Sequence, residues 1–121
     1  MFALRLAYSI ALGEPFLGRS VRRGDVLILD AELNEAEALR RIHRIRRGLG
    51  LDRVPKGLFY LQLTESLGYA ETRKLCLDAI ERVRPRLTIL DSFSVACAGL
   101  DLNGPDDIIE LMNAMKSWAV A

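Results

Sequence analysis

Acidic residues follow two short apolar runs in this sequence, at positions suited to metal and water chemistry. Val26–Leu29 leads into Asp30 and then Glu32, and Leu87–Leu90 leads into Asp91. Runs that are apolar on both faces are typical of buried parallel strands, and open α/β sheets bind ligands at the carboxyl ends of such strands. An aspartate there can hold Mg²⁺ through a water molecule, and a nearby glutamate can orient or deprotonate an attacking water. By position Asp91 fits the first role and Glu32 the second, although an acid at a strand end often only caps the next turn.

Strands that alternate with helices would carry these acids to one edge of a sheet. The pattern predicts strands over 26–30, 58–61 and 87–91, helices over 2–12, 34–47, 70–83 and 105–118, and connections over 14–24, 49–57 and 92–104. Asn34 is a good N-cap, and Glu37 three residues later gives a capping-box pattern. Pro85 ends the third helix, because the residue before a proline avoids the helical region. Repeated β-α units predict a three-layer α/β fold with a mostly parallel sheet, here an incomplete one.

Helical periodicity also predicts which residues face the core. The helix over 2–12 is apolar nearly all round, which is typical of a helix buried inside a larger structure. The expected buried residues of the other helices are Ala38, Leu39, Ile42, Ile45 and Leu49 in the second, Leu75, Ala79 and Val83 in the third, and Ile108, Leu111, Met112, Met115 and Trp118 in the last.

The composition indicates one globular domain. The chain has 121 residues, of which 50% are hydrophobic and 27% charged, and its net charge of +1 gives no overall attraction to nucleic acid or acidic membranes. Cys76 and Cys97 form no CxxC motif and the chain has a single histidine, which argues against a zinc site. We expect both thiols to be reduced and buried in a cytoplasmic protein. No apolar run approaches the roughly 18 residues that a membrane span needs.

One predicted helix is rich in arginine, with Arg40, Arg41, Arg44, Arg46 and Arg47. This helix could contact nucleic acid, but no aromatic residues are interleaved for base stacking, so a solvated helix face is the main expectation. His43 lies among these arginines and is expected at the surface. Residues 101–104, Asp-Leu-Asn-Gly, faintly resemble a calcium loop, but the later ligands are missing. We interpret them as a helix-capping loop.

Three segments carry a resemblance to a known family. Residues 7–19 read AYSIALGEPFLGR, residues 23–32 read RGDVLILDAE, and residues 87–92 read LTILDS. Together they resemble the RecA-like P-loop ATPases of the RepA helicase type, which are grouped with the AAA-family ATPases. The resemblance covers essentially the whole chain, and the Gly-Glu-Pro-Phe-Leu-Gly turn is its most specific part. It implies that Glu32 is the catalytic base and that Asp91 ends the Walker B strand and is linked to Mg²⁺.

The resemblance further implies ATP and Mg²⁺ as cofactors, action on DNA, and a homo-oligomeric ring in the complete protein. The sequence departs from the family because it contains no GxxxxGK[ST] phosphate-binding loop, which the family places just before Phe2 or Ala3. The strands that carry the family's sensor and arginine finger are also missing. We therefore expect residues 1–121 to be a single partial RecA-like domain that does not hydrolyse ATP alone.

Two other classes compete with this interpretation. The main alternative is a non-enzymatic α/β interaction module that binds partners through the arginine helix or an exposed sheet edge. A response-regulator receiver domain has a similar length and strand-end acids. A receiver begins with a strand, however, and its acids are separated by fewer elements than Asp30 and Asp91 are.

Overall fold

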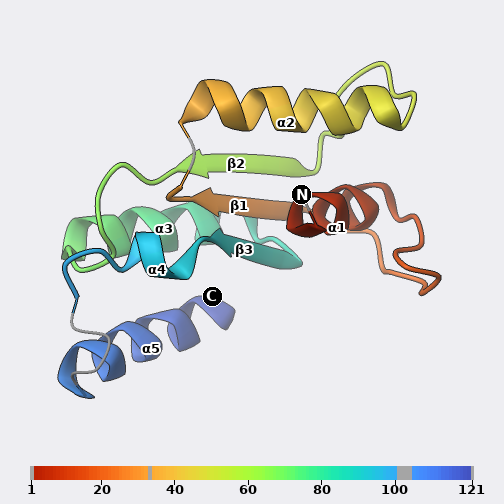
Figure 1. The fold of residues 1–121 in the computed structure, drawn as a ribbon. Helices are drawn as coiled ribbons and strands as arrows, with labels where there is room; N and C mark the ends of the chain where they lie inside the picture. Colours follow the sequence, from red (N-terminus) through yellow and green to blue (C-terminus); the bar gives the residue numbers. More distant parts are fainter. Residues whose placement is uncertain (1, 33, 101–104, 121) are drawn as a thin grey trace.

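A three-stranded parallel sheet lies at the centre of the fold, with helices on both of its faces (Figure 1). The computed structural model describes residues 2–32, 34–100 and 105–120. The elements in chain order are α1 (Phe2–Leu12), β1 (Val26–Asp30), α2 (Glu35–Gly48), β2 (Leu58–Gln62), α3 (Ala70–Val83), β3 (Leu87–Asp91), α4 (Phe93–Ala96) and α5 (Pro105–Ala119). Each predicted strand and helix is therefore present, and the three-layer α/β prediction is confirmed.

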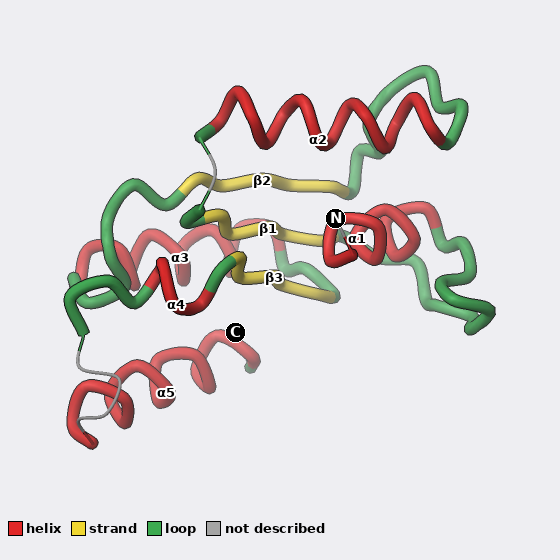
Figure 2. The backbone as a smooth tube through the Cα atoms, in the orientation of Figure 1, coloured by secondary structure: helices red, strands yellow, loops and turns green. Residues whose placement is uncertain are grey.

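The strand order is β2-β1-β3, so the first strand in the sequence occupies the middle (Figure 2). All three strands run parallel with their ends aligned, and Asp30 is the register partner of both Gln62 and Asp91. Side chains alternate between the two faces along a strand. Val26, Ile28 and Asp30 consequently share one face, and the two leucines between them share the other.

The two faces of the sheet are covered by different helices. Leu27 and Leu29 lie in the largest apolar cluster with residues of α3 and α5, whereas Val26 and Ile28 pack with Ala7 of α1. A third cluster joins α1 to α2 through Tyr8, Ile42 and Ile45. The Tyr8 hydroxyl donates to the Ile42 carbonyl oxygen at 2.7 Å. Burial raises the pKa of Tyr8, which keeps this hydroxyl a donor.

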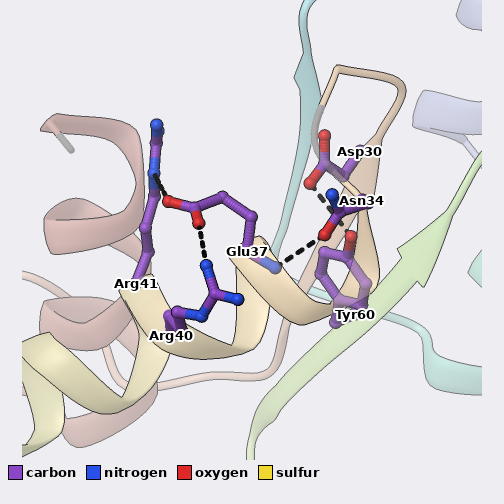
Figure 3. A network of polar contacts seen from close by, with 6 residues as sticks. All are labelled: Asp30, Asn34, Glu37, Arg40, Arg41 and Tyr60. Carbon is purple, nitrogen blue, oxygen red and sulfur yellow. Dashed lines mark hydrogen bonds and ion pairs between the residues drawn. The ribbon is translucent and has the colours of Figure 1, made fainter.

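The start of α2 confirms the predicted N-cap. The Asn34 side-chain oxygen accepts from the Glu37 backbone N–H at 2.8 Å. The Glu37 carboxylate forms ion pairs with Arg40 at 2.8 Å and Arg41 at 3.5 Å (Figure 3). The capping-box pattern therefore marks the helix start correctly, while its glutamate binds arginines one turn further along.

The predicted buried faces need three corrections. In α3 the buried residues are Thr72, Cys76 and Ile80, whereas Leu75 is 47% exposed. Leu39 and Met112 are also exposed, at 42% and 41%. Periodicity predicts the apolar side of a helix to within about one residue. The angle at which the helix meets the sheet then decides which residues of that side are buried. That angle is a property of the packing and is not encoded in the spacing alone.

Helix α1 is less buried than its composition suggests. Ala7, Tyr8, Ser9 and Ala11 are buried, but Phe2 is 65% exposed. One face of α1 packs on the sheet, so the expectation of burial all round the helix is wrong for the structure as described.

Strand β3 also differs from its prediction as a buried strand. It lies at an edge of the sheet, its apolar residues are only half-buried, and Asp91 is exposed. Its apolar composition gave no indication of this, because an edge strand can carry the same residues as a central one.

The segment after β3 was predicted as one long connection over 92–104. It contains the short helix α4, and the peptide bond between Asp91 and Ser92 is cis. Residues 101–104, interpreted above as a helix-capping loop with a faint calcium-loop pattern, lie outside the described residues. Cys76 and Cys97 are buried free thiols, as predicted, and burial raises the pKa of Cys76 to about 11.

Candidate functional site

The carboxyl edge of the sheet brings Asp30 and Asp91 side by side. They are register partners on adjacent parallel strands, so both side chains point to the face covered by α1 and α2. Asp30 is buried, with 3% of its surface exposed, whereas Asp91 is exposed. One acid of the pair is thus enclosed by the protein, and the other is open to a ligand.

A pocket open to solvent lies between this sheet face, the beginning of α1 and helix α2. Asp30 and Asp91 form its acidic wall, and Arg41 of α2 lies among the lining residues with Tyr60 of β2. The floor is apolar and includes Ile28. The site therefore combines two carboxylates and one guanidinium above an apolar floor.

Asp30 uses both carboxylate oxygens to hold neighbouring groups. Its Oδ1 accepts from the backbone N–H of Glu32 at 2.9 Å, and its Oδ2 accepts from the Tyr60 hydroxyl at 3.0 Å (Figure 3). The bond to the residue two positions on is the Asx-turn geometry that aspartate favours at the end of a strand. Asp30 thereby fixes the turn that presents Glu32.

Glu32 itself is exposed and does not line the pocket. The structure thus places Asp91 in the pocket with Asp30, and it places Glu32 on the turn that leaves the same strand end. Sequence reasoning did not assign Tyr60 or Arg41 to the site. The sequence carried no signal for Tyr60, because its place near Asp30 depends on the register of β2, in which Tyr60 is the partner of Ile28.

The side chains at this edge suit Mg²⁺, which keeps several water ligands, better than a cation that needs three or more protein ligands. Within the described ranges, no group of three or more His, Cys, Asp or Glu side chains could hold a metal. Mg²⁺ commonly takes one or two carboxylates and completes its shell with water and phosphate oxygens. Asp91 fits this pattern because its carboxylate is exposed, whereas both oxygens of Asp30 are engaged.

The sequence match extends over the same elements that build this edge. Residues 1–121 match the family model described as an AAA domain. The chain belongs to this AAA domain family. The family is one of P-loop ATPase domains, so a nucleotide-binding domain of ATPase type is the functional class, and nucleotide with Mg²⁺ is the ligand that the family implies. No curated protein matches the chain.

The family match therefore agrees with the resemblance noted in the sequence at the level of an AAA-type ATPase domain. The structure agrees with it in the parallel sheet and in the acids at the carboxyl edge. In the described part of the chain, no helix is long and apolar enough to cross a membrane.

Tyr60 gives this edge a testable pH dependence. Burial, followed by the hydrogen bond to Asp30, raises the pKa of Tyr60 above its ordinary value of 10.0. The folded chain then holds the phenol proton more tightly than the unfolded chain does. This contribution to stability is complete below pH 10 and is lost as the pH rises above it.

We expect Tyr60→Phe to flatten the alkaline loss of stability. Urea unfolding between about pH 9 and 11 measures it, and the free energy of unfolding of the variant should fall less steeply than that of the wild type. Tyr69→Phe is the matched control, because Tyr69 is exposed. Equal slopes for wild type and Tyr60→Phe would contradict the raised pKa of Tyr60, and with it the burial and the bond to Asp30 that raise it.

Proposed function

We propose that this chain supplies the catalytic edge of an ATP-hydrolysing RecA-like motor domain of the RepA helicase type. The observation that carries the proposal is the position of Asp91, which is exposed at the carboxyl end of β3 and lines the pocket beside α1. In this proposal Asp91 would hold Mg²⁺ through a water molecule, and Glu32 would activate the water that attacks the phosphate. Bound Mg²⁺ would neutralise charge that develops on the phosphate oxygens.

The hydrogen bonds support Glu32 over Asp30 as the water-activating acid. A general base needs a free carboxylate oxygen within reach of the water. Both oxygens of Asp30 accept bonds from Tyr60 and the Glu32 backbone, and the residue is buried. Glu32 is exposed on a turn that Asp30 holds in place. We therefore assign Asp30 the role of positioning Glu32.

The start of α1 supports the location of the phosphates. Ala3 and Leu4 line the pocket that also contains Asp91. The amino end of a helix carries free N–H groups and a partial positive charge, which favour phosphate. Because none of the 121 residues forms a GxxxxGK[ST] loop, we propose that hydrolysis needs further phosphate-binding groups from outside them.

The resemblance to the RepA helicase type supports three finer parts of the proposal. They are action on DNA, assembly into a homo-oligomeric ring and a cytoplasmic location. Each would follow from membership of the RepA helicase type.

The proposed role of Asp91 predicts a change in magnesium dependence. ATP hydrolysis should be measured on the product of the complete reading frame that contains these residues, with Mg²⁺ varied at saturating ATP. We expect Asp91→Asn to raise the Mg²⁺ concentration needed for half-maximal turnover at least about tenfold, since the loss of a metal-linked group commonly costs 10- to 100-fold. Asp78→Asn, an exposed aspartate of α3, is the matched control and should behave as the wild type.

Two results would contradict this account. One is an unchanged Mg²⁺ dependence in Asp91→Asn, which would remove Asp91 from the metal site. The other is full ATP turnover by the 121-residue chain alone, which would show that no further phosphate-binding groups are needed.

A further inference from the structure

Positive charge is concentrated in one segment of this nearly neutral chain. Seven of the 17 lysines and arginines, and one of the 16 acids, fall within residues 40–56. That segment therefore carries a formal charge of +6 and the rest of the chain −5, which combine to the net charge of +1. A segregated charge of this size produces a local field that the net charge conceals.

Helix α2 separates its arginines from its apolar residues. Ala38, Ile42 and Ile45 are buried against α1 and the sheet. The opposite side carries Arg40, Arg44 and Arg47, all exposed and spaced as neighbours along one helix face; we call these three residues the arginine stripe. At 1.5 Å per residue the stripe extends for about 10 Å. Helix α2 lies on the outside of the fold, on the far side of the sheet from α5 (Figure 1).

The structure leaves most of this stripe available to a partner. In the described part of the chain, the side chains of Arg44 and Arg47 form no hydrogen bond or ion pair. Arg40 shares the single carboxylate of Glu37 with Arg41, and its side chain is 72% exposed. Arg46 is different, because it donates to the carbonyl oxygens of residues 51 and 52 and so holds the turn after α2.

We propose that the arginine stripe binds the phosphate backbone of a nucleic acid, which rests on the proposed function insofar as it locates on α2 a contact for the action on DNA. Guanidinium groups present planar pairs of donors that match phosphate oxygens, and several of them in a row match a repeating anion. No aromatic residue accompanies the stripe, so it offers no base stacking. The binding should therefore be independent of sequence and strongly dependent on salt.

An acidic membrane is the main competing partner, and the helix fits it less well. Helices that lie on membranes insert a broad apolar face into the lipid. The apolar face of α2 is already buried in the protein, and Leu39, at 42% exposure, is its one large apolar residue that is exposed. The stripe therefore offers electrostatic attraction with little to insert.

The test is fluorescence anisotropy of labelled single-stranded and duplex oligonucleotides of mixed sequence, titrated with the protein at salt concentrations from 50 to 200 mM. Three phosphate contacts predict a slope of log K against log salt of about −2.7 for the duplex and about −2 for the single strand. The triple variant Arg40→Gln, Arg44→Gln and Arg47→Gln should lose that slope and weaken binding at least about tenfold at low salt. Glutamine keeps a helix propensity close to that of arginine.

The matched control removes the same charge elsewhere, by Arg19→Gln, Arg22→Gln and Arg82→Gln, which are exposed residues outside α2. It should change the affinity less than about twofold. An equal loss in both triple variants would show that net charge alone decides binding and would overturn the proposal. Binding to phosphatidylserine vesicles without binding to either oligonucleotide would overturn it in favour of a membrane. Neither result bears on ATP hydrolysis, which the Asp91 experiment tests separately.

Discussion

Replacing Glu32 by Gln is expected to lower ATP turnover by about 10²- to 10⁴-fold, the usual contribution of a positioned general base. The expected effect falls on kcat, because glutamine keeps the size and the backbone bond to Asp30 while losing the proton acceptor. Binding of Mg-ATP should change little, since Glu32 is proposed to contact the attacking water and not the nucleotide. Single-turnover hydrolysis and a separate nucleotide-binding titration on the product of the complete reading frame distinguish the two effects.

Glu35→Gln is the matched control for this experiment. Glu35 is an exposed acid only three residues away, in the first turn of α2, and it should tolerate the same change with turnover within about twofold. If Glu32→Gln keeps wild-type turnover, the water-activating role of Glu32 is wrong. A comparable fall in the turnover of Glu35→Gln would show that the combined negative charge of the neighbouring acids matters, and that Glu32 does not act as a single base.

Replacing Leu29 by Ala is expected to cost about 2–5 kcal/mol in the free energy of unfolding, as large-to-small changes in a packed core do. Leu29 is fully buried in the central strand and belongs to the main apolar cluster between the sheet and α3 and α5. A single domain is commonly stable by only about 5–15 kcal/mol. The variant should therefore unfold at a much lower urea concentration, measured by circular dichroism at neutral pH.

Leu75→Ala is the informative control, because the sequence pattern placed Leu75 in the core and the structure places it 47% exposed. The substitution should cost less than about 1 kcal/mol, since alanine and leucine are both good helix formers and little apolar surface is lost. A loss at Leu75 as large as that at Leu29 would contradict the orientation of α3. The pair of variants therefore tests both the core and the corrected helix face.

Local signals in the sequence were sufficient to place most of the elements. Asn34 with Glu37 marks the start of α2, Pro85 limits α3, and the apolar runs before Asp30 and Asp91 mark two parallel strands. These signals act through short-range sterics and hydrogen bonds, so they are readable without a partner segment. The short helix α4 was missed because it makes one turn and has no cap hydrogen bond from the Ser92 side chain.

The residues of the candidate site were predictable in kind but only partly in arrangement. Parallel strands align their carboxyl ends, so the sequence predicted that the strand-end acids would share one edge, and Asp30 and Asp91 do. The hydrogen bond from Tyr60 to Asp30 required the register of a third strand, which spacing does not specify. The roles of Glu32 and Asp91 in catalysis remain predictions for the experiments above.

By itself the sequence determined the α/β class, the bounds of most elements, the buried cysteines and the acids at the strand ends, because each depends on local composition and periodicity. The tertiary structure decided that β1 is the central strand and that β3 is a half-buried edge strand. It also decided which side of α3 faces the core, and that Asp30 is buried while Asp91 is exposed. These features depend on which segments meet in space. Burial is a property of the assembled fold, so an apolar run followed by an acid reads the same whether its strand lies in the middle of a sheet or at its edge.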